Sequence, residues 1–179
     1  MVETRPKLTE DEFMALPDDG HKYELVNGEI KEVPTGWKHG LLAMRLAMLL
    51  APIARKYGEM ADSSTGCRMK SGNVRVPDVS FVLFGRAPQG PEAERFLDGA
   101  PDLAIEIISE SEDRSDAARK IVEYFESGAQ QVWTVQPLTQ SVTVYHSLDR
   151  VRTWEAHEEL TGGDLLPGFH CQVAEIFAA

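Results

Sequence analysis

The sequence predicts an α/β (α+β) fold in which helices flank a mixed β-sheet. Three observations support this prediction. The 179 residues suffice for one sizeable core and are too few for two comfortable domains, so we expect a single domain over residues 1–179. The segments read as helix, hairpin, helix, two strands, helix and three strands. The strand, helix and strand between Leu103 and Val135 indicate one parallel crossover.

The first half of the chain carries clear local signals. Thr9 and Glu12 have the spacing of a capping box, which predicts a short helix ended by residues 17–20. Asn-Gly at residues 27–28 predicts a hairpin, because both turn residues must accept a positive φ. The longest helix is expected from Trp37 to Tyr57, with Gly58 as its stop.

The second half alternates between strands and helices. Residues 74–84 are expected to form a strand broken near Pro77, and residues 85–100 a mobile loop rich in Gly, Pro and charge. A buried strand over residues 103–109 and a helix over residues 115–127 follow. Three short strands and a terminal strand with a short turn complete the prediction, at residues 131–135, 141–145, 151–156 and 165–177.

Composition limits the possible partners. The formal net charge of −11 argues against a basic surface that holds nucleic acid by counterion release alone, although a metal site can supply positive charge locally. Cys67 and Cys171 have no CxxC spacing, so neither a disulfide nor a thiolate zinc site is expected. We expect no signal peptide and no membrane span, because the apolar stretch at residues 41–54 is short and contains Arg45. A cytoplasmic location is the expectation.

Glu106 is the most informative candidate residue, because it lies in the middle of a strand that is otherwise apolar. Burying a lone carboxylate there costs several kcal/mol, roughly, unless a cation or hydrogen bonds compensate. Its pattern leaves two interpretations open: a metal ligand, or half of a buried salt bridge. Asp78 after Pro77 would by itself be explained as a capping residue at a strand start. Together, two carboxylates on adjacent strands can share one hard divalent cation.

Three further residues are candidates for the same site. Lys120 lies on the helix after the Glu106 strand, where it could stabilise developing charge or orient water, or could be an ordinary solvated lysine. Glu24 faces away from Tyr23 and is either a surface residue or a third carboxylate of the site. His39 opens the long helix and could face the same cleft, or could simply cap or pack there. Motifs of phosphate loops, dinucleotide folds and serine hydrolases do not occur.

The order and spacing of these motifs resemble a known family. The segments that carry the resemblance are residues 23–30, His39, residues 77–81 and 101–109, Asp116, Lys120, Tyr124, Gly128, Trp133 and residues 166–169. Together they resemble the Uma-two family of restriction endonucleases, within the PD-(D/E)xK nuclease superfamily, over residues 9–177.

The resemblance implies a restriction-endonuclease-like fold and assigns roles to residues. It makes Asp78 and Glu106 ligands of Mg²⁺, with Mn²⁺ as an alternative, Lys120 the catalytic lysine and Glu24 a further acidic member of the site. The sequence departs from the pattern at Ile108, where the usual E-x-K lysine would lie. It departs again at Gln136, where relatives often carry Asp, and we expect that position to be distal to the metal.

Two functions from different classes remain. The first is a metal-dependent endonuclease that hydrolyses DNA phosphodiester bonds. The second is a catalytically silent scaffold or partner-binding module that retains the nuclease fold, which the acidic charge favours. Surplus apolar residues on the long helix, Leu41, Met44 and Met48, predict a homodimer.

Overall fold

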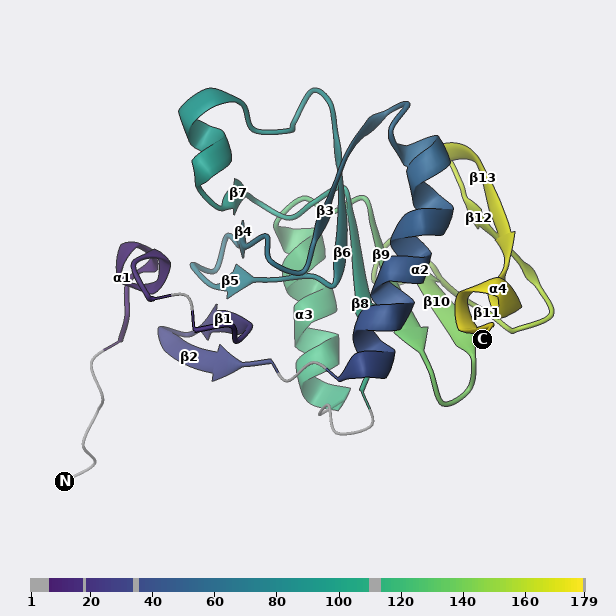
Figure 1. The fold of residues 1–179 in the computed structure, drawn as a ribbon, viewed down its shortest axis with the longest axis horizontal. Helices are drawn as coiled ribbons and strands as arrows, with labels where there is room; N and C mark the ends of the chain where they lie inside the picture. The colour runs from purple at the N-terminus through teal and green to yellow at the C-terminus, as the bar shows by residue number, and fades with distance from the viewer. Residues whose placement is uncertain (1–6, 18, 34–35, 110–113, 179) are drawn as a thin grey trace.

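A six-stranded mixed sheet forms the centre of the protein (Figure 1). The computed structural model describes residues 7–17, 19–33, 36–109 and 114–178. In spatial order the strands are β11 (Val151–Trp154), β10 (Ser141–Tyr145), β9 (Gln131–Gln136), β8 (Leu103–Ile107), β6 (Val79–Leu83) and β3 (Gly58–Asp62). β8 and β9 run parallel, and the other neighbours in this sheet pair antiparallel. The predicted mixed sheet and its parallel crossover are confirmed.

Two helices cover the two faces of this sheet. Figure 1 shows the central strands nearly edge-on, with α3 (Arg114–Glu126) on one side and α2 (Trp37–Ala54) on the other. Because successive side chains of a strand point to opposite faces, Leu103, Ile105 and Ile107 of β8 join the core cluster beneath α2. Ala104 joins the cluster beneath α3. Glu106 therefore belongs to the α3 side of the sheet.

A second, five-stranded sheet lies on the N-terminal side. Its strands in spatial order are β2 (Glu29–Glu32), β1 (Tyr23–Val26), β5 (Val74–Arg75), β4 (Cys67–Arg68) and β7 (Leu97–Asp98). The predicted β1–β2 hairpin turns at Asn27 and Gly28, whose φ angles are 54° and 79°. Before it, α1 (Glu10–Met14) begins with the predicted capping box of Thr9 and Glu12. Leu25 faces the small cluster around Phe13, so Glu24 points the other way, toward α3.

The C-terminal segment closes the α2 side. β12 (Glu159–Gly162) pairs with β13 (Leu166–Gln172), and α4 (Val173–Phe177) is the last described helix. Leu160, Phe169 and Ile176 pack into the same core as α2. α2 is therefore covered on one side by the central sheet and along a second side by this hairpin and α4.

The structure corrects three expectations about element boundaries. α2 ends at Ala54, and Gly58 is the first residue of β3 instead of a helix stop. A Cβ at Gly58 would lie 2.1 Å from the Val82 carbonyl oxygen, so close strand packing is the reason for glycine there. The segment expected to be a mobile loop contains a 3-10 helix, η1 (Gly90–Glu94), and strand β7, whose Leu97 is buried.

Candidate functional site

Asp78 lies immediately before β6, at the point where that strand meets β8. Its backbone N–H donates to the Ile105 carbonyl at 3.0 Å, and its Oδ2 accepts from the Ile107 N–H at 2.8 Å. The register pairs Val79 with Ile105, so continuing it by one residue places Asp78 opposite Glu106. The two candidate carboxylates are therefore neighbours across one antiparallel strand pair.

Two side chains from other elements approach the second oxygen of Asp78. Lys22 Nζ, just before β1, lies 2.8 Å from Oδ1, and His39 Nε2, in the first turn of α2, lies 2.9 Å from the same atom. The histidine contact is a close approach without the alignment of a hydrogen bond. Burial by itself would raise the pKa of Asp78, but the contacts with His39 and Lys22 outweigh it and lower that pKa to about 2.

Glu106 is buried on the α3 side of β8 and takes its partners from that helix. Tyr124 donates its hydroxyl to Oε1, and Lys120 Nζ lies 3.5 Å from Oε2. Burial is the largest influence on this carboxyl. Although the charge of Lys120 opposes it, burial and the nearby charges of Asp78 and Glu24 raise the pKa of Glu106 to about 7.

Glu24 holds Lys120 from the opposite side. Its Oε1 lies 3.2 Å from Lys120 Nζ and accepts from the Val76 N–H at 3.3 Å, while Oε2 accepts from Arg75 at 3.0 Å. The side chain is fully buried. Burial would raise the pKa of Glu24, but the charges of Lys120 and Arg75 keep it lowered, so this carboxylate is ionised.

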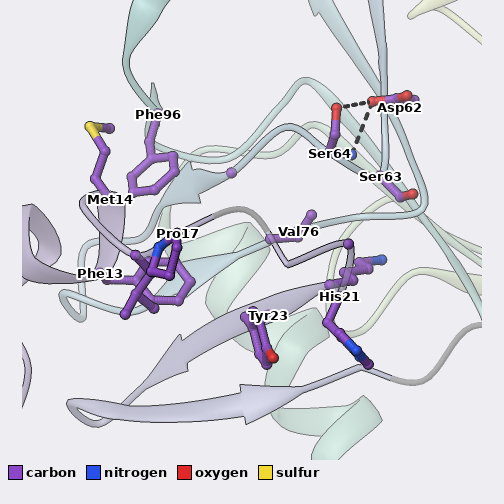
Figure 2. A pocket seen from close by; sticks show the side chains of 14 residues that line it. Phe13, Met14, Pro17, His21, Tyr23, Asp62, Ser63, Ser64, Val76 and Phe96 are labelled. Carbon is purple, nitrogen blue, oxygen red and sulfur yellow. Dashed lines mark hydrogen bonds between the residues drawn. The ribbon is translucent and has the colours of Figure 1, made fainter.

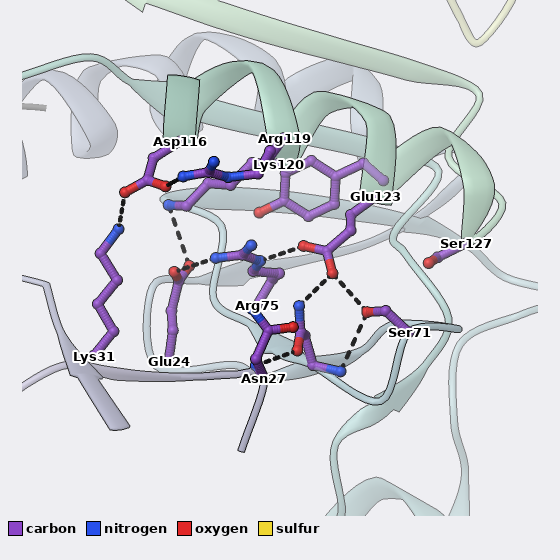
Figure 3. Close-up of polar contacts among 12 residues, drawn as sticks. Glu24, Asn27, Lys31, Ser71, Arg75, Asp116, Arg119, Lys120, Glu123 and Ser127 are labelled. Carbon is purple, nitrogen blue, oxygen red and sulfur yellow. Dashed lines mark hydrogen bonds and ion pairs between the residues drawn. The ribbon is translucent and has the colours of Figure 1, made fainter. Parts of the chain in front are cut away.

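A buried ion network continues from Glu24 away from the site (Figure 3). Arg75 Nε donates to Glu123 on α3 at 2.6 Å, in addition to its bond with Glu24. Glu123 also accepts from Ser71 and Asn73. Arg75 therefore fixes Glu24 relative to α3, and Glu24 in turn limits where the Lys120 ammonium can lie.

A small cavity opens beside His39 and Ile107. Its volume is about 220 Å³, and Lys38, Gln136 and Leu138 also line it. Gln136 shares a cavity with His39, which contacts Asp78, and with Ile107, whose N–H binds Asp78.

The donor set suits a hard divalent cation. Asp78 and Glu106 supply buried carboxylate oxygens, with side chains 3% and 7% exposed. Within the described part of the chain, no group of three or more His, Cys, Asp or Glu side chains gathers in a way that could hold a metal. Mg²⁺ is commonly bound through one or two carboxylates with water completing its shell, so two carboxylates fit such an ion.

The predicted residues fall into two groups, one around Lys120 and one around Asp78. Glu106 and Glu24 both contact that lysine, whereas Asp78 is joined to Lys22 and His39. Sequence reasoning missed Lys22, which reads as an ordinary polar residue at the start of a strand. Arg75 was also missed, because an arginine two residues before Pro77 has an ordinary surface pattern, although the structure buries it.

The fold is of the restriction-endonuclease-like class. Its structure is similar to that of "a putative nuclease belonging to DUF820" from Anabaena variabilis, with a TM-score of 0.82 at 23% identity, covering 95% of this chain and 97% of that one. Residues 10–174 match the Uma2 family, described as "Putative restriction endonuclease", and the chain belongs to that family. No match was found among curated proteins. None of the described helices is long and apolar enough to cross a membrane.

Proposed function

We propose that the protein is a divalent-cation-dependent endonuclease that hydrolyses DNA phosphodiester bonds. The observation that carries the proposal is a pair of buried carboxylates, Asp78 and Glu106, on neighbouring strands, with the buried ammonium of Lys120 beside Glu106. Membership of the Uma2 family supports the reaction class. We also propose a cytoplasmic location, in keeping with two buried cysteines that are both free thiols.

The residues of the site divide the work by their chemistry. Asp78 and Glu106 would hold Mg²⁺ or Mn²⁺, which when bound activates water and polarises the phosphodiester. Asp78 is ionised at neutral pH, whereas Glu106 in the metal-free protein titrates near pH 7. Lys120 carries a positive charge and cannot ligate a metal in that form, so its role is to stabilise charge that develops on the phosphate. Glu24 positions Lys120.

A second candidate is a silent scaffold that keeps the nuclease fold. The observation in its favour is that both carboxylates already have partners: Lys22 and His39 on Asp78, and Tyr124 and Lys120 on Glu106. The net charge of −11 also disfavours attraction to DNA. A scaffold of this kind would be stable without metal and indifferent to it.

Thermal melting during a Mn²⁺ titration separates the two functions. A cation that binds only the native state stabilises it, by about 2.7 kcal/mol at a hundredfold excess over Kd. We expect this stabilisation for the wild type and its loss in Asp78→Asn. The control is Asp116→Asn, because Asp116 pairs with Lys31 outside the site. Nicking of supercoiled plasmid DNA by the wild type and the control, and not by Asp78→Asn, completes the test. A wild type that melts identically with and without Mn²⁺ contradicts the nuclease proposal.

We further propose that the protein is a homodimer joined through α2. Leu42, Leu46 and Leu50 face the core, whereas Leu41, Met44 and Met48 are 36%, 59% and 67% exposed. Trp37 is 87% exposed and lies four residues before Leu41, so it belongs to the same exposed apolar stripe of α2 as Leu41, Met44 and Met48. α2 contains no acidic residue along its 18 positions, and its lysine and arginine residues are the exposed Lys38 and the half-buried Arg45.

A further inference from the structure

Lys22 occupies a position that a metal ion would need. Its ammonium lies 2.8 Å from Asp78 Oδ1, and its side chain is only 10% exposed. Oδ2 of the same carboxylate is engaged by the Ile107 N–H. Oδ1 is thus the oxygen through which Asp78 would reach a cation, and Lys22 and His39 both contact it.

A divalent ion and both of these groups cannot share that oxygen. Mg²⁺ approaches its oxygen ligands to about 2.1 Å, and an ammonium in direct contact with the same atom would repel it. His39 belongs to the first turn of an 18-residue helix, which restricts its movement. Lys22 precedes β1 and has a flexible four-carbon stem, so it is the group that can withdraw.

Lys22 lines a cavity into which its side chain could withdraw, and Figure 2 shows Asp62, Ser63 and Ser64 at the same cavity. The cavity has a volume of about 550 Å³, and Lys22, His21, Asp62, Ser63 and Ser64 are among its lining residues. Asp62 accepts hydrogen bonds from the Ser64 side chain and backbone, which are the main reasons for its lowered pKa. The charge of Lys22 makes a smaller contribution in the same direction, so Asp62 already lies within the field of the ammonium.

We propose that Lys22 is a positioning residue that holds Asp78 in the metal-free protein and yields that oxygen to the cation by swinging toward Asp62. The inference rests on the proposed function, because it requires a metal at Asp78. The Lys22–Asp78 ion pair then has a definite role. Lys22 compensates the buried charge of Asp78 when no metal is bound, and its competition for Oδ1 lowers the affinity of the protein for the cation.

Isothermal titration of the metal-free protein with Mn²⁺ tests this role without substrate. Lys22→Gln keeps a hydrogen-bond donor for Asp78 and removes the competing charge, so we expect Mn²⁺ to bind about tenfold more tightly than to the wild type. Lys22→Arg retains the charge and should not show the gain. The matched control is Lys31→Gln in the same hairpin, which removes the same charge from the Asp116 pair and should leave affinity unchanged.

A second variant tests the destination of Lys22. Asp62→Asn removes the negative charge that would hold the withdrawn ammonium, so it should weaken Mn²⁺ binding when Lys22 is present and have no effect in the Lys22→Gln background. If Lys22→Gln does not fold, the Mn²⁺ affinity of Asp62→Asn alone tests the inference. An affinity equal to that of the wild type then overturns it. If the wild type binds Mn²⁺ as tightly as Lys22→Gln does, the inference about Lys22 is wrong and the proposed function stands. Absence of Mn²⁺ binding in every variant overturns the proposed function as well.

Discussion

Glu106 couples the stability of the metal-free protein to pH. Its pKa is about 7 in the folded state and has an ordinary value of 4.5, so the folded protein binds more protons than the unfolded chain between these values. Stability therefore falls as pH rises from about 4.5 to about 7 and then levels off. The shift corresponds to roughly 3 kcal/mol.

We predict that Glu106→Gln removes this dependence. Urea unfolding in the presence of EDTA at pH 5, 6, 7 and 8 should show the wild type losing stability over the interval and the variant holding a flatter profile. The comparison uses the slope and not the absolute stability, because the amide also changes the bond with Tyr124. Equal slopes for the two proteins would assign the titration to a different group.

Lys120 should affect the rate without holding the metal. We predict that Lys120→Ala lowers DNA cleavage by about two to three orders of magnitude, the usual loss for one charge-stabilising contact. Mn²⁺ binding, measured by calorimetry, should persist, because the carboxylates Asp78 and Glu106 remain. Lys56→Ala, at an exposed lysine just after α2, serves as the control. Loss of Mn²⁺ binding in Lys120→Ala would instead mean that the lysine is required to keep the carboxylates in place.

Most of the buried carboxylates of the candidate site could be predicted from the sequence, but two of their ion-pair partners could not. Glu106 stood out because a charged residue interrupts an apolar strand. Glu24 was expected to face away from Tyr23, and its pattern, like that of His39, left a site role and an ordinary role both open. Lys22 and Arg75 were missed, because a lysine before a strand and an arginine next to a proline break are both ordinary surface patterns. Their pairing depends on contacts across 56 and 48 residues, which local periodicity does not encode.

At the level of elements, substitution of two glycines by alanine should change the stability of the protein in opposite directions. We expect Gly58→Ala to destabilise the protein by about 2–3 kcal/mol, since the added methyl would collide with the Val82 carbonyl in the adjacent strand β6. Gly40→Ala in α2 meets no atom within 4 Å and should stabilise by about 1 kcal/mol through helix propensity. Thermal unfolding of both variants is the measurement. A neutral Gly58→Ala would mean that β3 can move away from β6.

Elements with a strong local signal were the ones that sequence predicted well. The capped helix α1, the Asn-Gly hairpin and the apolar strand β8 each follow from a few neighbouring residues. β3 and β12 were missed. β3 lies at the edge of the central sheet, and its Gly-Glu-Met-Ala-Asp sequence lacks the alternation of apolar residues that marks a strand. Pairing with β6 makes it a strand, and that contact lies outside any local window.

At the scale of the whole molecule, the exposed apolar residues of α2, Leu41, Met44 and Met48, predict a dimer that introduced negative charges should dissociate. Light scattering should give twice the chain mass for the wild type and the monomer mass for the double variant Met44→Glu, Met48→Glu, because two carboxylates would face the partner helix. Leu148→Glu changes a residue of similar exposure (56%) between β10 and β11 and should stay dimeric. A wild type that remains monomeric at high concentration contradicts the proposal.

The buried ion network also restricts how this sequence can diverge. Four carboxylates, Glu24, Asp78, Glu106 and Glu123, face three permanent cations, Lys22, Arg75 and Lys120. Neutralising Arg75 takes a shared cation from the carboxylates of Glu24 and Glu123, and breaking a buried pair in this way costs about 3–5 kcal/mol. Such positions can therefore change only in concert. In an alignment of Uma2 sequences, replacement of the residue equivalent to Arg75 by a neutral one should be accompanied by neutral residues at the positions of Glu24 or Glu123, a correlated pattern that isolated surface pairs such as Arg152 and Glu158 should not show.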